Sequence, residues 1–241
     1  MNKLLRLVFI LSLLILVSSH SQGQGADPII QTGEAVKLVD YVYGILDNYV
    51  GLVPSIGVVL GRDAVLVVDT GLGPCNDEIV LQEVNYLGPK DTLYVVTTHY
   101  HLEHTLGFAG LGGQARLIIP RIQQEEMENG DAIKNAFARR SDVTADLLRD
   151  VDYPKADILF DGEIALDLGD LTAWVFYLGS LHTRGDTMIC IGEEGVLFTG
   201  DVVMQGLFPS LDTNNGSIKR WMEVLDVLQA LSPTVIVGAH G

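Results

Sequence analysis

The chain has 241 residues, of which 48% are hydrophobic and 19% are charged. This composition is typical of a folded domain and excludes an intrinsically disordered chain. The formal net charge of −16 repels phosphate backbones, so we expect no nucleic acid partner. We expect one large domain over residues 26–241, because no linker or internal repeat divides the sequence.

Residues 1–25 are predicted to be a secretory signal peptide. Lys3 and Arg6 form a short basic segment, an almost wholly apolar run follows, and small and polar residues come next. The apolar run is shorter than the ~20 residues that a membrane helix needs. We therefore expect an exported protein, periplasmic or secreted, cleaved between Ser21 and Ala26. An uncleaved anchor is the alternative, and membrane contact is expected only through this segment.

The first half of the remaining sequence combines predicted strands with one predicted helix. Apolar or alternating stretches, which are typical of strands, lie at residues 36–50, 56–60, 64–68, 93–96 and 116–119. Asn76 is predicted to cap a helix that ends before Gly88, with Cys75 in the turn before it.

The second half begins with a polar segment, residues 123–149, which is predicted to be a helical insert on or beside the functional site. Short strands are predicted at residues 157–160, 164–168, 172–178, 187–191, 195–198 and 234–237. Ser217 is predicted to cap an amphipathic helix before the last strand. The apolar face of that helix carries Trp221, Val224, Leu225, Leu228 and Leu231.

This order of elements, strands with a helix followed by strands with a helix, predicts an α/β fold. Two sheets that pack face to face with helices on the outside satisfy it. The two cysteines, Cys75 and Cys190, are expected to be free thiols, with Cys190 as a small residue of a buried strand.

Three histidines, His99, His101 and His104, lie within one short segment that follows a predicted strand, and Glu103 lies among them. In an extended segment, residues 99, 101 and 103 would point the same way, and a turn after His101 would bring His104 toward a second position. Histidine and carboxylate ligands suit borderline metals such as zinc. The segment therefore predicts a metal site.

Further polar residues lie where predicted strands end, which is where sheets commonly place their sites. These residues are His182, Asp201 and His240. Taken singly, His182 and His240 are explained as well by an ordinary surface position as by a role as metal ligands. Asp69 is explained as well by a turn before a glycine as by a role in the site, and Asp186 could likewise cap the next strand.

Together these motifs resemble the metallo-β-lactamase superfamily. The residues that carry the resemblance follow the family's order and are 68–71 (VDTG), 99–104 (HYHLEH), 182–187 (HTRGDT), 198–201 (FTGD) and 238–241 (GAHG). The resemblance covers essentially the whole sequence after the predicted signal peptide. It implies a four-layer αββα sandwich of two mixed sheets and a metal-dependent hydrolase. The motifs specify this superfamily far better than they specify a substrate.

The resemblance also implies the ligands of two zinc ions. The first ion would be bound by three histidines, His99, His101 and His182. The second would be bound by Glu103, His104 and His240. Asp201 would bridge the two ions, and Asp69 would orient a ligand or hold its loop.

The sequence departs from the family in two places. Glu103 stands where the family usually has aspartate, and its extra methylene changes how the carboxylate meets the second metal. We therefore expect a weaker second site. The sequence also ends one residue after His240, whereas relatives usually continue into another helix. We expect either a truncated domain or a loosely held His240.

The expected reaction is the attack of a metal-bound hydroxide on an acyl carbon of a small ester, lactone, thioester or lactam. Glu103 and Asp201 are the candidate catalytic residues, and no serine or cysteine nucleophile is required. The resemblance also bears on the substrate: in many β-lactamases of the superfamily, a lysine shortly after the metal ligand in this region binds the substrate carboxylate. Residues 202–205 contain no lysine, so antibiotic hydrolysis is not favoured. Leu207, Phe208 and Pro209 are expected to form an apolar wall.

Two other functions stay open. A mononuclear iron oxygenase of the same fold would need only His99, His182 and Asp201, which leaves the remaining candidate ligands unexplained. A non-catalytic, exported metal-binding protein is the second alternative, and a weakened second site would favour it. A phosphodiesterase or nuclease fits the motifs but not the strongly negative charge.

Overall fold

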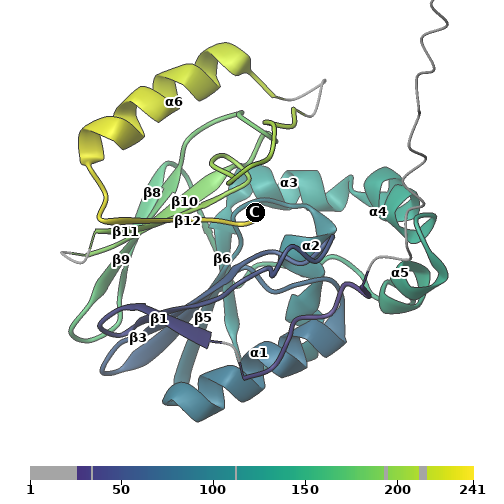
Figure 1. The fold of residues 1–241 in the computed structure, drawn as a ribbon, viewed down its shortest axis with the longest axis horizontal. Helices are drawn as coiled ribbons and strands as arrows, with labels where there is room; N and C mark the ends of the chain where they lie inside the picture. Colours follow the sequence, from purple (N-terminus) through teal and green to yellow (C-terminus); the bar gives the residue numbers. More distant parts are fainter. Residues whose placement is uncertain (1–25, 34, 112, 193–194, 212–215) are drawn as a thin grey trace, which may run out of the picture.

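The computed structural model describes residues 26–33, 35–111, 113–192, 195–211 and 216–241 (Figure 1). The predicted signal peptide, residues 1–25, lies outside the described residues. Among the described residues, no helix combines the length and the apolar character needed to cross a membrane.

The first sheet has seven strands in the order of the sequence. They are β1 (Ala35–Val39), β2 (Val42–Ile45), β3 (Ile56–Leu60), β4 (Ala64–Val68), β5 (Thr92–Val96), β6 (Arg116–Pro120) and β7 (Ile158–Phe160). Strands β1 to β4 pair antiparallel, and β4 to β7 pair parallel, so the sheet is mixed. The stretch predicted as strand at 36–50 divides into β1 and β2, because Tyr41 turns the chain with a φ of 66°.

The second sheet has five strands in the order β12-β11-β10-β9-β8. They are β8 (Glu163–Asp167), β9 (Thr172–Tyr177), β10 (Thr187–Ile191), β11 (Val196–Gly200) and β12 (Val235–Gly238). All neighbours pair antiparallel except β11 and β12, which pair parallel. This sheet is therefore mixed as well.

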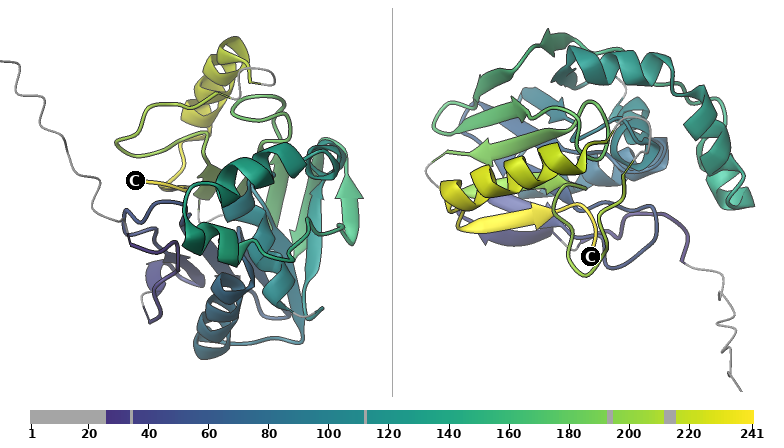
Figure 2. Two further views of the ribbon diagram at one scale, coloured as in Figure 1. Left: turned by 90° about the vertical axis from the view of Figure 1, so that its right-hand side faces the viewer. Right: turned by 90° about the horizontal axis from the view of Figure 1, so that it is seen from above.

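The two sheets pack face to face, and helices cover their outer faces (Figures 1 and 2). Buried side chains from both sheets, such as Leu66 and Phe198, form the apolar layer between them. Helix α1 (Pro74–Leu87) buries Val80 against the first sheet, and α6 (Ile218–Leu231) buries Trp221 against the second. The predicted four-layer αββα sandwich is confirmed.

The polar segment predicted to be helical forms three short helices. They are α3 (Arg121–Glu128), α4 (Asp131–Ala138) and α5 (Asp142–Leu147). All three lie at one end of the sandwich, near the short helix α2 (Leu102–Thr105) and the 3-10 helix η1 (Leu106–Leu111) that follow β5 (Figure 1). The insert therefore covers the end of the fold to which the histidine cluster belongs.

Helix α1 begins earlier than predicted. Gly73 precedes it with a φ of 79°, and Pro74 is its first residue, a position that suits the fixed φ of proline. Cys75 and Asn76 therefore lie inside the helix, so the predicted turn and cap are wrong. Asn76 is buried, and its Oδ1 accepts a hydrogen bond of 2.7 Å from the backbone of Ile30. It ties the start of the domain to the helix.

Helix α6 begins as predicted, because the Ser217 hydroxyl accepts a hydrogen bond from the backbone N–H of Arg220. Leu231 was predicted to face the core but is 58% exposed. It is the last helical residue, where the helix has run past the buried face of Trp221, Val224 and Leu228.

Both cysteines are free thiols, as predicted. Cys190 is only half-buried, however, and packs on the side of the second sheet that faces α6. Burial raises the pKa of its thiol, so it stays protonated at neutral pH.

Candidate metal centre

The histidine cluster lies just beyond the end of β5. His99 and His101 are in the loop, whereas Glu103 and His104 are already in helix α2. The prediction that residues 99, 101 and 103 point the same way is therefore wrong for Glu103. The helical turn directs Glu103 toward His104 and His240 instead. One short segment thus supplies donors to two neighbouring groups.

Three other candidate ligands reach the same place from the second sheet. His182 lies in the turn between β9 and β10, Asp201 directly follows β11, and His240 lies two residues after β12. The strands end at the same edge of the sandwich, so residues far apart in the sequence meet there. Every residue predicted as a ligand lies in this cluster.

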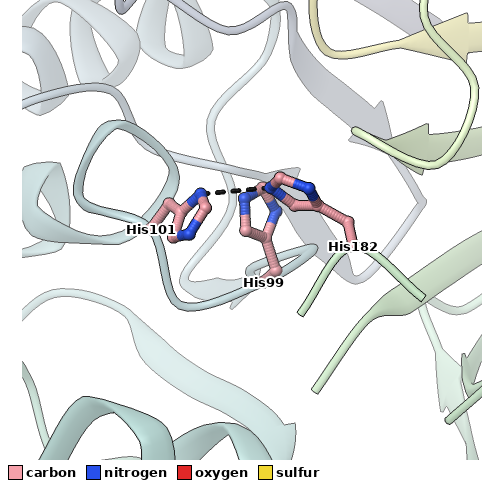
Figure 3. A group of neighbouring side chains, drawn as sticks. All are labelled: His99, His101 and His182. Carbon is pink, nitrogen blue, oxygen red and sulfur yellow. Dashed lines mark hydrogen bonds between the residues drawn. The ribbon is translucent and has the colours of Figure 1, made fainter. Parts of the chain in front are cut away.

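The first ligand group consists of His99, His101 and His182 (Figure 3). Its candidate donor atoms all lie within 4.8 Å of one another. His182 donates from Nδ1 to the carbonyl oxygen of Ser210 at 2.5 Å, which leaves its Nε2 with a free lone pair. That Nε2 lies 3.2 Å from Nδ1 of His101 (Figure 3). Convergent imidazole nitrogens of this kind are a cation-binding arrangement.

The second ligand group consists of Glu103, His104 and His240, again with donor atoms within 4.8 Å of one another. Asp201 lies between the two groups. Its Oδ2 is 3.5 Å from Nε2 of His182, and its Oδ1 is 3.6 Å from Nε2 of His104 and 3.7 Å from Nε2 of His240. Each oxygen of this carboxylate therefore faces a different group.

Several donor atoms of the site are buried without a hydrogen-bond partner among the described residues. They are His99 Nε2, Glu103 Oε2, His104 Nε2 and Asp201 Oδ1. A buried polar atom left unpaired costs about 1–3 kcal/mol, and folded proteins rarely retain several side by side. Bound cations would satisfy all four atoms. The donor set of imidazoles and carboxylates therefore fits divalent metal ions of the zinc type.

A second layer of contacts fixes His104. Asp69 Oδ2 accepts a hydrogen bond from His104 Nδ1 at 3.0 Å, so the opposite nitrogen, Nε2, is directed at the site. Asp69 also accepts from the backbone N–H of Thr98 at 2.7 Å and from the Thr98 hydroxyl at 2.9 Å. Its own backbone has a φ of 65°, a strained conformation that sites often retain. These contacts match the orienting role that the resemblance implied for Asp69.

Thr98 is the residue that sequence reasoning missed. Its hydroxyl lies near Asp69, His99 and His104, so it links three members of the site. Gly200, with a φ of 54°, lies against it, and a side chain at that position would collide with the Thr98 hydroxyl. The only sequence signal for Thr98 is its place directly before His99.

Asp186 holds the turn that carries His182. Its carboxylate accepts hydrogen bonds from the backbone N–H groups of Leu181, His182 and Thr183 and from the Thr183 hydroxyl. It thus organises the turn before β10 and does not only cap that strand. Burial raises the pKa of this carboxyl to about 6, against the opposing effect of these hydrogen bonds.

The histidines of the site differ in charge: His99 and His101 are neutral, whereas His104 is protonated at neutral pH. Burial, together with the neighbouring histidines, lowers the pKa of His99 and His101 well below the ordinary value, so both rings are neutral and their lone pairs are available. Burial also lowers the pKa of His104, but Asp69, Asp201 and Glu103 outweigh it and raise that pKa to about 9. The second ligand group therefore lies in a strongly negative environment that favours cations.

A cavity of about 520 Å³ opens onto the second ligand group. Glu103, Asp201 and His240 line it together with Leu52 and Leu207. The predicted apolar wall is thus borne out for Leu207. It is wrong for Phe208, which is 95% exposed, and for Pro209, which is also exposed, because neither residue lines the cavity.

The insert borders the site on the other side. Phe137 of α4 has its ring centroid 6.4 Å from that of His101. The guanidinium of Arg140 stacks on the Phe137 ring, at 3.8 Å from the ring centroid. This contact bears out the prediction that residues 123–149 lie beside the site.

The fold and the ligand groups define a class of metal-dependent hydrolase with an αββα sandwich. The family model of the metallo-beta-lactamase superfamily matches residues 49–240, so the chain belongs to that superfamily. The resemblance stated from the motifs is confirmed. No curated protein matches the chain.

Solved structures of the same fold cover most of the chain. A metallo-beta-lactamase from Pontibacter korlensis is 18% identical with a TM-score of 0.62, over 86% of this chain and 91% of its own. The DIM-1 metallo-beta-lactamase exposed to ceftazidime is 18% identical with a TM-score of 0.65, over 88% and 90%. A metallo-beta-lactamase family protein from Thermus thermophilus is 21% identical with a TM-score of 0.64, over 85% and 75%. At this identity the likeness establishes the fold and leaves the substrate open.

Proposed function

We propose that this protein is a zinc-dependent hydrolase that binds two zinc ions and cleaves a small carbonyl compound, an ester, lactone, thioester or lactam. The first ligand group and the second ligand group would each hold one ion, and Asp201 would be shared between them. The observation that carries the proposal is a set of four buried donor atoms in one cluster that have no hydrogen-bond partner among the described residues: His99 Nε2, Glu103 Oε2, His104 Nε2 and Asp201 Oδ1.

Bound zinc ions polarise a carbonyl group and lower the pKa of water toward neutrality. The chain's own residues supply the positioning. Asp201 keeps its two oxygens toward different ligand groups, and Asp69 holds His104 with Nε2 facing the site. Glu103 lines the cavity with an unpaired Oε2, and in this proposal it orients the attacking water.

The cavity supports a small organic substrate. A volume of about 520 Å³ is within the range of small-molecule sites, and the carboxylates and imidazole lie beside apolar side chains. Leu52 and Leu207 would contact the substrate's apolar part, while Glu103 and Asp201 meet the reacting group. A cavity that combines apolar side chains with carboxylates next to the ligand groups also favours an enzyme over a protein that only stores metal.

The two-metal proposal uses every donor of the cluster, whereas an iron oxygenase would use only His99, His182 and Asp201. An iron oxygenase would leave Glu103 Oε2 and His104 Nε2 buried without a hydrogen-bond partner among the described residues. We also propose export to the periplasm or the medium, which rests on the sequence of residues 1–25 alone.

The test is the metal content of the purified protein, measured together with hydrolysis of a chromogenic cephalosporin, a lactone, a thioester and a simple ester. About two zinc ions per chain and turnover of at least one of these substrates would support the proposal. One iron per chain, or zinc without turnover of any acyl substrate, would contradict it. His101→Ala should abolish both metal uptake and turnover.

A further inference from the structure

Helix α3 connects the two loops that carry the first ligand group. Gln123, fully buried on this helix, donates from Nε2 to the Thr97 hydroxyl at 3.1 Å and to the Thr97 carbonyl at 3.3 Å. Thr97 is two residues before His99. One turn further along the helix, Glu126 reaches the turn that carries His182. A single helix thus binds both segments from which the three histidines project.

Glu126 makes its contact through the backbone of that turn. Its Oε1 accepts a hydrogen bond of 2.9 Å from the N–H of Arg184, two residues after His182. Glu126 is 7% exposed, and its second carboxyl oxygen, Oε2, is buried without a side-chain hydrogen-bond partner among the described residues. The backbone N–H of Gly185 also faces this carboxyl and, like that of Arg184, opposes the rise that burial causes in its pKa. A buried carboxyl whose hydrogen-bond partners are backbone groups of one turn is costly to retain, so a purely structural role explains it poorly.

Gly185 shows how closely the turn approaches α3. A side chain at this position would lie 2.8 Å from Glu126 Oε2 and 2.9 Å from Gln123 Cβ, so no other residue fits without a shift of the turn. On the inner side, Asp186 accepts from the N–H of His182 at 2.6 Å. The His182 turn is therefore held from both sides, by Asp186 from within and by Glu126 from the helix.

We propose that Glu126 is a positioning residue of the metal centre. Through the backbone N–H of Arg184, it fixes the turn so that the His182 imidazole meets His99 and His101 at the spacing that a shared metal ion needs. This inference rests on the proposed metal centre. It assigns a role to a residue that is neither one of the proposed ligands nor one of the residues described above as orienting them. Loss of the contact would let the turn shift away from α3 and loosen His182.

The chain offers a matched control one residue away. Glu125 is on the same helix and has the same charge, but among the described residues its carboxylate meets only the Arg184 side chain, at 3.6 Å, in an exposed ion pair. Glu125→Ala therefore removes a carboxylate near the turn without removing its backbone contact. Glu126→Gln keeps one acceptor for the Arg184 N–H and serves as the conservative variant.

The experiment measures zinc affinity by competition with a chromophoric chelator and, separately, the visible spectrum of the cobalt-substituted protein. Glu126→Ala should weaken the tighter zinc site by about tenfold, as loss of an outer positioning contact commonly does. It should also change the cobalt spectrum. Glu126→Gln should restore both properties, and Glu125→Ala should match the wild type. If Glu126→Ala does not fold, Glu126→Asp is the substitute, because its carboxylate is one methylene too short for Arg184.

A folded Glu126→Ala with wild-type zinc affinity and cobalt spectrum would overturn the inference while leaving the proposed function intact. The same holds if it only lowers the unfolding temperature, since that is the result of a merely structural role. A wild-type protein that takes up no metal would overturn the proposed function and this inference together.

Discussion

Asp69 and His104 form a fully buried pair in which carboxylate Oδ2 lies 3.0 Å from ring Nδ1. The pair determines which nitrogen of His104 faces the site, because Asp69 holds the Nδ1 proton and directs Nε2 inward. With a pKa of about 9, His104 also carries a proton on Nε2 at neutral pH, and a bound metal ion would replace that proton. Asp69 also binds the backbone before His99 through Thr98. One aspartate therefore aligns a ligand of the second group with a segment of the first.

Asp69→Asn should weaken zinc binding at the second ligand group and lower kcat/KM by about 10- to 100-fold, since outer contacts of this kind control ligand orientation. Asparagine tolerates the left-handed backbone of this position, so the variant should fold. Zinc titration and steady-state kinetics measure the effect. Asp63→Asn, in an exposed ion pair with Arg62, is the control. Equal zinc affinity in Asp69→Asn and wild type would refute this role.

Glu103 can be tested by two substitutions that separate charge from length. Glu103→Gln keeps the size but removes the charge, so the bound zinc should fall from two ions per chain toward about one. The first ligand group does not include Glu103 and should stay loaded. Glu103→Asp, which restores the usual family residue, should retain both ions. Metal analysis after gel filtration is the measurement, and a Glu103→Gln protein with two tightly held ions would contradict the assignment.

Metal removal should destabilise the protein, because it leaves buried donors such as His99 Nε2 and Glu103 Oε2 without a hydrogen-bond partner among the described residues. A ligand that binds only the folded state stabilises it by about 2.7 kcal/mol at a hundred times its Kd. Thermal unfolding with a chelator and with added zinc should therefore give clearly different Tm values. His101→Ala, which should take up no metal, should show no change of Tm with zinc. A wild-type Tm that is the same with chelator, with added zinc and with neither would contradict the proposed metal centre.

Glu126 gives a pH dependence of stability with a defined sign. Burial raises the pKa of its carboxyl from 4.5 to about 7, although the Arg184 backbone N–H opposes the shift and Asp186 adds to it. The folded state therefore binds more protons than the unfolded state between pH 4.5 and 7, and its stability falls as pH rises through this window.

Glu126→Gln replaces the carboxyl by an amide, which has no proton to lose in this pH range. In the metal-free protein, its stability relative to the wild type should therefore increase from pH 5 to pH 8. Urea unfolding at several pH values measures the difference. A difference that stays constant, or that shrinks with rising pH, would show that the carboxyl is not buried as described.

The elements with local signals were predicted from the sequence. His99, His101 and His104 are close in sequence, so their cluster was visible without a fold. The helix predicted over Trp221 and Leu228 has a clear apolar period and a capping serine, and both are present. His182 and His240 depended on the family resemblance, because singly they look like surface histidines.

What the sequence did not predict depends on contacts between distant segments. Asn76 looked like a helix cap, but Pro74 begins the helix and Asn76 binds a segment more than forty residues earlier. Glu126 lay in a polar stretch that gave no sign of burial. Thr98 carries no pattern of its own, and its role follows only from the approach of Asp69.

The most direct test of the two-metal centre is a crystal grown with zinc and measured on both sides of the zinc absorption edge. We expect two anomalous peaks, one among His99, His101 and His182 and the other among the second ligand group, with Asp201 between them. A single peak, or peaks away from these residues, would contradict the account.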